Sequence, residues 1–86
     1  MNILIRNYIN RLTIDDLNTL ALKNNINFNS DELNFTYNYI KKNWELMLSN
    51  PNLFNIDKYK EYYTIDNFNK LKDLYNKYFT KYYKYF

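Results

Sequence analysis

Apolar side chains recur at intervals of three and four residues along almost the whole of this 86-residue chain. That spacing gathers them on one face of an α-helix, and the alternation typical of a half-buried strand never persists for long. A chain this short can build only one core, so we expect one helical domain over residues 1–86. The predicted fold class is all-α, a compact bundle of four helices plus one short connecting helix.

Capping boxes mark two of the helix starts. In such a box, the cap residue and a side chain three positions later satisfy each other's backbone N–H groups. Thr13 and Asp16 have this spacing, and so do Asn29 and Glu32. An apolar pair around each box is spaced for a hydrophobic staple: Leu12 with Leu17, and Phe28 with Leu33. Helices are therefore predicted to begin directly after Thr13 and Asn29.

The same patterns predict where the helices run. They cover about residues 2–12, 13–23, 30–49 and 65 to near the end, and residues 57–62 could form the short connecting helix. Asn24 and Asn25 end the second helix, because asparagine tolerates the left-handed backbone that glycine would otherwise supply. The third helix ends at Asn50, since the residue before a proline is pushed out of the α region.

The start of the last helix echoes the start of the second. Residues 64–71, TIDNFNKL, match residues 13–20, TIDDLNTL, at five of eight positions. A threonine cap, an acidic first turn and a leucine stripe are a general way to begin a helix. We interpret the echo as shared capping and not as a structural repeat.

The expected core combines side chains from the last three long helices, with the N-terminal helix laid across it. Its centre is predicted to be Leu17, Leu20, Leu33, Tyr37, Ile40, Trp44, Phe68, Leu71 and Tyr75. The N-terminal helix has an apolar face that also needs a neighbour: Leu4, Ile5, Tyr8, Ile9 and Leu12.

Missing residue types exclude many kinds of active site. The chain has 0 Cys, 0 His and 0 Gly, which removes zinc ligand sets, thiolate nucleophiles, imidazole bases and glycine-rich phosphate loops. The adjacent acids Asp15–Asp16 and Asp31–Glu32 point about 100° apart on a helix and suit a first turn. We predict no catalytic residue, no cofactor, no metal and no small-molecule substrate, and hence a protein that is not an enzyme.

No membrane or targeting segment is visible in the sequence. No uninterrupted apolar run is longer than the three residues found at residues 3–5, far short of a membrane span or a signal-peptide core. We therefore expect a cytoplasmic protein without a membrane partner, and the lack of cysteine is compatible with that location.

The C-terminal segment, residues 74–86, combines seven aromatic rings and three lysines with no acid. These are the components of a surface that stacks and neutralises single-stranded nucleic acid. The candidate nucleic-acid surface is Lys77, Lys81, Lys84, Tyr82, Tyr83 and Tyr85. On a helix, however, the rings and the lysines gather on opposite sides, which favours an aromatic packing face. A net charge of +3 with only two arginines is also modest for a nucleic-acid binder.

A second apolar stripe lies on the third helix, opposite its core face. Phe35, Tyr39 and Leu46 form it. The stripe is either buried beneath the C-terminal helix, the interpretation we favour, or exposed as a surface for a dimer or another partner.

The first third of the chain carries a resemblance. Met1-Asn2-Ile3, Ile9-Asn10, Leu12-Thr13 and Asp16-Leu17 resemble the start of a family of short, uncharacterised proteins of low-G+C Gram-positive bacteria, classified as a domain of unknown function. The resemblance implies a small helical cytoplasmic bacterial protein, and it transfers no catalytic or binding residue. The tyrosine-rich C-terminal end departs from that family.

These observations predict a non-enzymatic protein-interaction module, with a partner protein or a second copy as its ligand. Eleven tyrosines are more than one small core can hide, so exposed rings are where a partner surface is expected. The alternative is nucleic-acid binding by the C-terminal helix.

Overall fold

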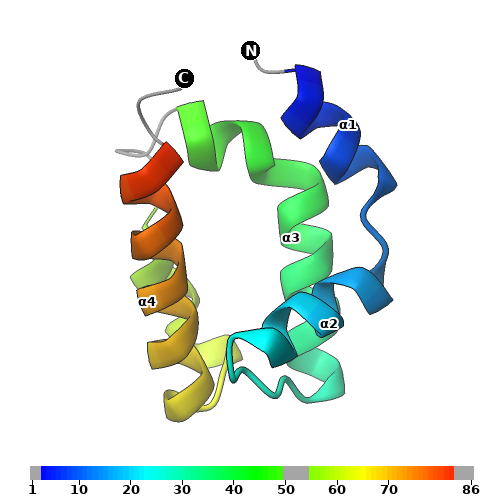
Figure 1. The fold of residues 1–86 in the computed structure, drawn as a ribbon. Coiled ribbons are helices and arrows are strands. Elements are labelled where there is room, and N and C mark those ends of the chain that lie inside the picture. The colour runs from blue at the N-terminus through cyan, green and yellow to red at the C-terminus, as the bar shows by residue number, and fades with distance from the viewer. Residues whose placement is uncertain (1–2, 50–54, 83–86) are drawn as a thin grey trace.

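The computed structural model describes residues 3–49 and 55–82, and the side chains of these residues except 48 and 78–82. The described residues form five helices and no strand, which confirms the all-α bundle of four helices plus a short connecting one. They are α1 (Ile3–Arg11), α2 (Ile14–Lys23), α3 (Ser30–Ser49), the 3-10 helix η2 (Ile56–Tyr62) and α4 (Ile65–Tyr82) (Figure 1). Within these ranges, no helix is long and apolar enough to cross a membrane.

Helix α3 is the centre of the arrangement. It packs against α1, α2 and η2, and η2 also packs against α4. Helices α1 and α2 lie along one side of α3, whereas α4 stands across from them (Figure 1). The C-terminal part of α3 bends over toward α4 in the same view. The position of each other element therefore depends on how it meets α3 or η2.

Both predicted capping boxes are present. At α2, Asp16 N–H donates to Thr13 Oγ1, and Thr13 N–H donates to the Asp16 carboxylate, both at 3.1 Å. At α3, Glu32 N–H donates to Asn29 Oδ1 at 2.8 Å, and Asn29 N–H donates to Glu32 Oε1 at 2.9 Å. Beyond the end of α2, Asn25 has the expected left-handed backbone, with φ 64°.

The Glu32 carboxylate also joins α3 to α4. Glu32 is only 1% exposed, and its Oε2 accepts the backbone N–H of Thr64, the cap of α4, at 2.7 Å. Asn67 Nδ2 donates to Glu32 Oε1 at 2.8 Å and to the backbone oxygen of Asn27 at 3.0 Å. A buried carboxylate is tolerated when hydrogen bonds satisfy it. With the Asn29 N–H, three donors do so here.

The echo between the starts of α2 and α4 is therefore only partial. Thr64 Oγ1 accepts the N–H of Asn67 at 3.2 Å, as Thr13 does for Asp16. The reciprocal bond differs, because the Thr64 N–H donates to Glu32 of another helix and not to the residue three positions on. Position 67 is an amide that itself donates to Glu32. The two sites share a cap but not a capping box.

We predict that Glu32→Gln costs about 3 kcal/mol of folding stability, because its amide group would face a buried N–H donor that then lacks an acceptor. Urea unfolding measures the loss. Glu61→Gln is the matched control, since Glu61 is exposed and should change stability by less than about 0.5 kcal/mol. Equal effects of the two substitutions would show that the buried carboxylate is dispensable.

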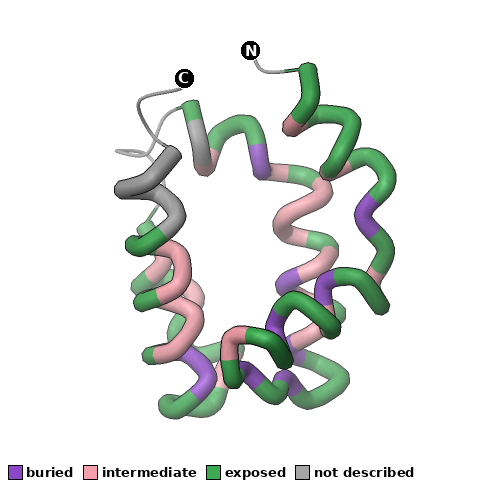
Figure 2. The backbone as a smooth tube through the Cα atoms, in the orientation of Figure 1, coloured by how far each residue is buried: buried purple, intermediate pink, exposed green. Residues whose placement is uncertain are grey.

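The most buried apolar cluster lies at the turn between α2 and α3. Ala21, Ile26 and Phe28 form it (Figure 2). Four half-buried side chains, from α3, from α4 and from the residue directly after η2, pack against it: Leu33, Tyr63, Leu71 and Leu74. Two of the three central residues belong to the loop, where no helical periodicity marks them, and so the sequence did not place them in the core.

The predicted core is confirmed in part. Leu17, Trp44 and Phe68 are buried. The residues at intermediate burial are Leu33, Tyr37, Ile40, Leu71 and Tyr75. The prediction is wrong for Leu20, which is 37% exposed. Ala21 is the α2 residue that enters the cluster, and the next side chain along a helix points about 100° away.

Helix α1 is attached to α3 through its C-terminal end. Lys41 Nζ donates to the backbone oxygens of Ile9, Asn10 and Leu12 at 2.8, 3.1 and 3.1 Å. The hydroxyl of Tyr37 donates to the Leu12 oxygen at 3.1 Å. The last carbonyls of a helix lack partners within it, and a cation there is also favoured by the helix dipole. One lysine of α3 thus caps α1 and fixes its position.

Replacing Lys41 with Met keeps the apolar stem and removes the charged donor. We expect a loss of about 2 kcal/mol, the scale of hydrogen bonds to a charged group, together with faster amide exchange in α1. Lys42→Met changes an exposed neighbour and should alter neither. If amide exchange in α1 were the same in both variants, Lys41 would not be what holds α1.

Candidate functional site

The predicted stripe on α3 is not one continuous exposed surface. Phe35 and Tyr39 are half-buried. Helix η2 contacts both rings directly, and the C-terminal helix, which was expected to cover them, contributes Leu71 and Tyr75 to the cavity that they line. Phe35 stacks on Tyr62 with ring centroids 4.3 Å apart, and Tyr39 meets Tyr59 edge-on at 4.8 Å. Of the three residues, only Leu46 is exposed, at 39%. The stripe therefore serves mainly to pack η2.

A cavity of about 60 Å³ lies within this aromatic cluster. Tyr39, Tyr59 and Tyr63 contribute to its almost entirely apolar lining. The hydroxyls of Tyr39 and Tyr59 lie 3.0 Å apart, and those of Thr36 and Tyr63 lie 2.6 Å apart. Since a water molecule occupies about 30 Å³ in the liquid, the cavity is too small for a cofactor or a metabolite.

Burial raises the pKa of three tyrosines above the ordinary value of 10.0. For Tyr39, the hydrogen bond with Tyr59 adds to the effect of burial on the pKa. For Tyr63, burial outweighs the hydrogen bond with Thr36, which lowers the pKa. For Tyr75, burial alone raises the pKa. Each ring therefore holds its proton more strongly in the folded protein than in the unfolded chain.

This difference predicts alkaline destabilisation. Below pH 10 both states keep the protons, whereas above it the unfolded chain releases protons that the folded rings retain, so the free energy of unfolding falls as the pH rises. Urea unfolding at a series of pH values from 8 upward measures this decline. In a triple variant with phenylalanine at positions 39, 63 and 75, the free energy of unfolding should fall less steeply with pH than in the wild type. An equally steep decline in that variant would contradict the assignment.

The predicted nucleic-acid surface lies mostly outside the described part of the structure. Lys77 is exposed at the described end of the segment. The side chains of Lys81 and Tyr82, and all of Tyr83, Lys84 and Tyr85, lie outside the described residues. Earlier in α4, Lys70 pairs with Asp66 at 3.1 Å and Lys72 pairs with Asp57 at 2.8 Å. The nucleic-acid surface stays a prediction.

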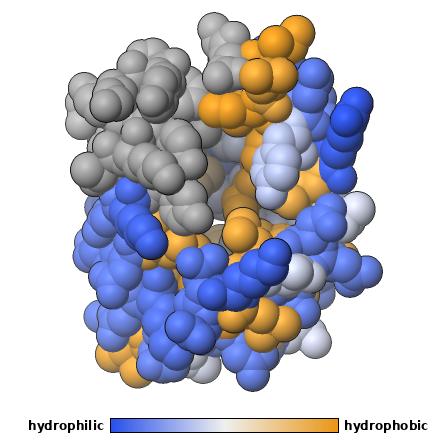
Figure 3. Space-filling view, in the orientation of Figure 1, coloured by the Kyte–Doolittle hydropathy of each residue, from blue (hydrophilic) through white to orange (hydrophobic). Residues whose placement is uncertain are grey.

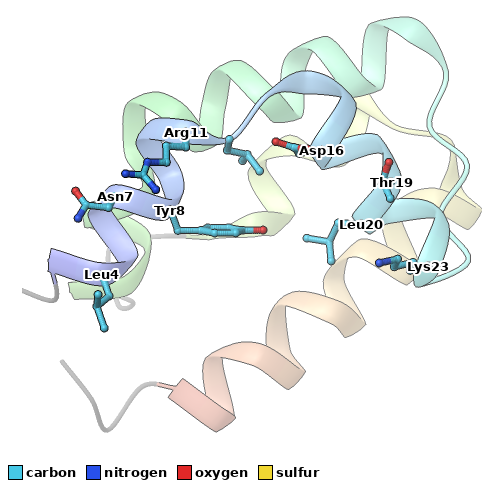
Figure 4. Close-up of a pocket in the computed structure, with 9 residues that line it drawn as sticks. Leu4, Asn7, Tyr8, Arg11, Asp16, Thr19, Leu20 and Lys23 are labelled. Atoms are coloured by element: carbon cyan, nitrogen blue, oxygen red, sulfur yellow. The ribbon is translucent and has the colours of Figure 1, made fainter.

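A groove of about 620 Å³ lies between α1 and α2. Its apolar lining consists of Leu4, Tyr8, Leu12 and Leu20. Figure 4 shows Tyr8 of α1 and Leu20 of α2 pointing toward one another across the groove, with Leu4 nearer the N-terminus of α1. In the space-filling view, apolar side chains gather over α1 and continue into the hollow beside α2 (Figure 3).

The groove walls leave large apolar side chains in contact with solvent. Leu4 is 74% exposed, Tyr8 58% and Leu20 37%. Single exposed apolar residues are normal, but several in one depression are typical of an interaction site. The sequence does not predict this surface as a site. It predicts that Leu20 lies in the core and that one neighbour covers the apolar face of α1.

The width of the apolar face on α1 explains why the groove forms. Ile5 and Ile9 are half-buried and Leu12 is buried, whereas Leu4 and Tyr8 remain exposed and line the groove. Four of these residues belong to the nine-residue helix and Leu12 directly follows it, and together they form a face wider than one neighbouring helix can bury. A face this wide was the available signal, because it implies a second contact beyond the one with α3.

Polar side chains line the rest of the groove. They are Asn7, Arg11, Asp16, Thr19 and Lys23. The Asp16 carboxylate already accepts the N–H of Thr13. Among the described residues, no group of three or more acidic side chains could hold a metal ion. The site is therefore apolar at its centre and charged at its edge, as protein-interaction surfaces are.

Comparisons with protein-family models, with curated proteins and with solved structures find no match to this chain. The resemblance of the N-terminal third to a family of uncharacterised bacterial proteins stays a prediction. Any functional assignment therefore depends on the residues themselves.

Proposed function

We propose that this protein is a non-enzymatic interaction module that binds an amphipathic helix of another protein in the groove between α1 and α2. The observation that carries the proposal is the position of three exposed apolar side chains, Leu4, Tyr8 and Leu20, on the walls of one groove. Burying them would stabilise a complex by removing apolar surface from water.

The shape of the groove favours a helix over a small molecule. Small-molecule sites enclose most of their ligand, whereas the walls of this groove are open to solvent, with Leu4 three-quarters exposed. Helices α1 and α2 have 9 and 10 residues, so each wall is about 14 Å long. Apolar anchors at positions i, i+4 and i+7 of a bound helix span about 10.5 Å. Two turns of a partner helix therefore match the walls in length.

Two further features of the sequence support the proposal. The lack of cysteine, histidine and glycine removes the usual components of enzyme sites, and the lack of cysteine suits the bacterial cytoplasm.

Nucleic-acid binding by Lys77, Lys81, Lys84 and neighbouring tyrosines is the second candidate function. It predicts affinity for oligonucleotides that falls steeply with salt.

A designed helical peptide with leucines at i, i+4 and i+7 and uncharged polar residues elsewhere tests the proposed site. It should shift the amide NMR signals of α1 and α2 in a saturable way, and a peptide with the same leucines scattered around the helix should not. Tyr8→Glu and Leu20→Glu should weaken binding by about tenfold or more, because a carboxylate would then be buried against the peptide.

Leu22→Glu is the matched control, since Leu22 is 51% exposed and does not line the groove. It should bind the peptide as the wild type does. Urea unfolding of each variant checks that the fold is intact. Signals that do not move at millimolar peptide, or equal weakening by all three substitutions, would show that the groove is not a helix-binding site.

A further inference from the structure

The charges around the groove indicate which kind of helix it accepts. Arg11 and Lys23 both line the groove and both are exposed. All nine acidic side chains of the chain lie within the described residues, and none of them forms an ion pair with Arg11 or Lys23. The two cations are thus available to a partner.

The single acid of the groove lining does not cancel these cations. Asp16 lies at the first turn of α2, where its carboxylate accepts the N–H of Thr13 and completes the capping box. Arg11 and Lys23 lie in the last turns of α1 and α2. In the view of Figure 4 they flank the Tyr8 and Leu20 pair from opposite sides. A helix seated over that pair would bring its own flanking residues to both cations.

We infer that the partner is an acidic amphipathic helix of another protein, with carboxylates beside its apolar anchors. The inference rests on the proposed function. A helix dipole also favours cations in a last turn, but it does not require that both cations border the same apolar groove. Complementary charges at the rim select among partners and speed their association.

A second copy of this chain would be a poor occupant of the groove. Among the described helices, α1 has the most exposed large apolar side chains, Ile3, Leu4 and Tyr8, and so it is the helix we expect a second copy to dock. Helix α1 contains no acid, and its charged residues are Arg6 and Arg11. Docking would therefore place these arginines against Arg11 and Lys23 of the other copy, and like charges brought together at an interface oppose binding.

Three peptides with the same leucine anchors test this inference, with Glu, Gln or Lys at the positions beside them. At low salt we expect the Glu peptide to bind about tenfold or more tightly than the Lys peptide, because two weak ion pairs replace two repulsions. The preference should decrease as salt is added. Equal affinities for the Glu and Lys peptides, with the Gln peptide still bound in the groove, would overturn the inference and leave the proposed function standing.

Charge reversal locates the effect. The double variant Arg11→Glu, Lys23→Glu should reverse the preference, whereas Lys42→Glu, Lys60→Glu, which changes two exposed residues outside the groove and gives the same net charge, should retain it. The double variant Arg11→Gln, Lys23→Gln should abolish the preference. This variant places no acid at a helix C-terminus, where the helix dipole disfavours negative charge. Equal effects of the two glutamate pairs would show that net charge and not the groove selects the peptide.

Two other outcomes would also overturn the inference. Binding of none of the three peptides would remove the proposed function and the acidic partner with it. Sedimentation equilibrium tests the second copy as occupant, and we expect a monomer at all concentrations. A dimer that Tyr8→Glu dissociates and Leu22→Glu does not would show that the groove is occupied by this chain itself.

Discussion

The buried carboxylate of Glu32 is the interaction on which the rest of the structure depends. It accepts hydrogen bonds from the backbone N–H groups of Asn29 and Thr64 and from the side-chain amide of Asn67. One side chain therefore satisfies backbone donors at the starts of two helices that begin more than thirty residues apart in the sequence. Because an unsatisfied carboxylate cannot remain buried without a large cost, α3 and α4 must start beside each other. That constraint also fixes the C-terminal end of the segment that contains η2, and η2 covers Phe35 and Tyr39.

Helix α1 is less constrained, and the candidate site is a consequence. Helices α2, α3 and α4 contribute side chains to the cluster around Ala21, Ile26 and Phe28 or pack directly against it, whereas neither α1 nor the short η2 contains a buried residue. It is held by Lys41 and Tyr37 at its C-terminal end and by one side of its apolar face against α3. The other side of that face borders the groove. The bundle thus satisfies its own core and leaves an apolar surface on the helix that contributes least to it.

Much of the fold could be predicted from the sequence. The boxes at Thr13 and Asn29 placed two helix starts correctly, and Asn25 was correctly assigned to the left-handed backbone after α2. These features involve residues within four positions of each other, so they are visible without tertiary structure. The candidate site was not predicted. Leu20 has the periodicity of a core residue, and its exposure depends on Ala21 being the residue that enters the cluster. Phe35 and Tyr39 look equally available in the sequence, and their burial depends on η2.

The sequence by itself determined the helices and where two of them begin, because spacing and capping are local properties. Only the tertiary structure decided which apolar residues are used for packing. A helix face wider than one neighbour can bury must be divided between the core and solvent, and the division depends on the contacts that every other helix makes. For Glu32, the local pattern predicted that its carboxylate caps α3, and the packing of the helices makes the same carboxylate a cap of α4 as well. For α1, the local pattern predicted one apolar face, and the packing divided it into a contact with α3 and a wall of the groove.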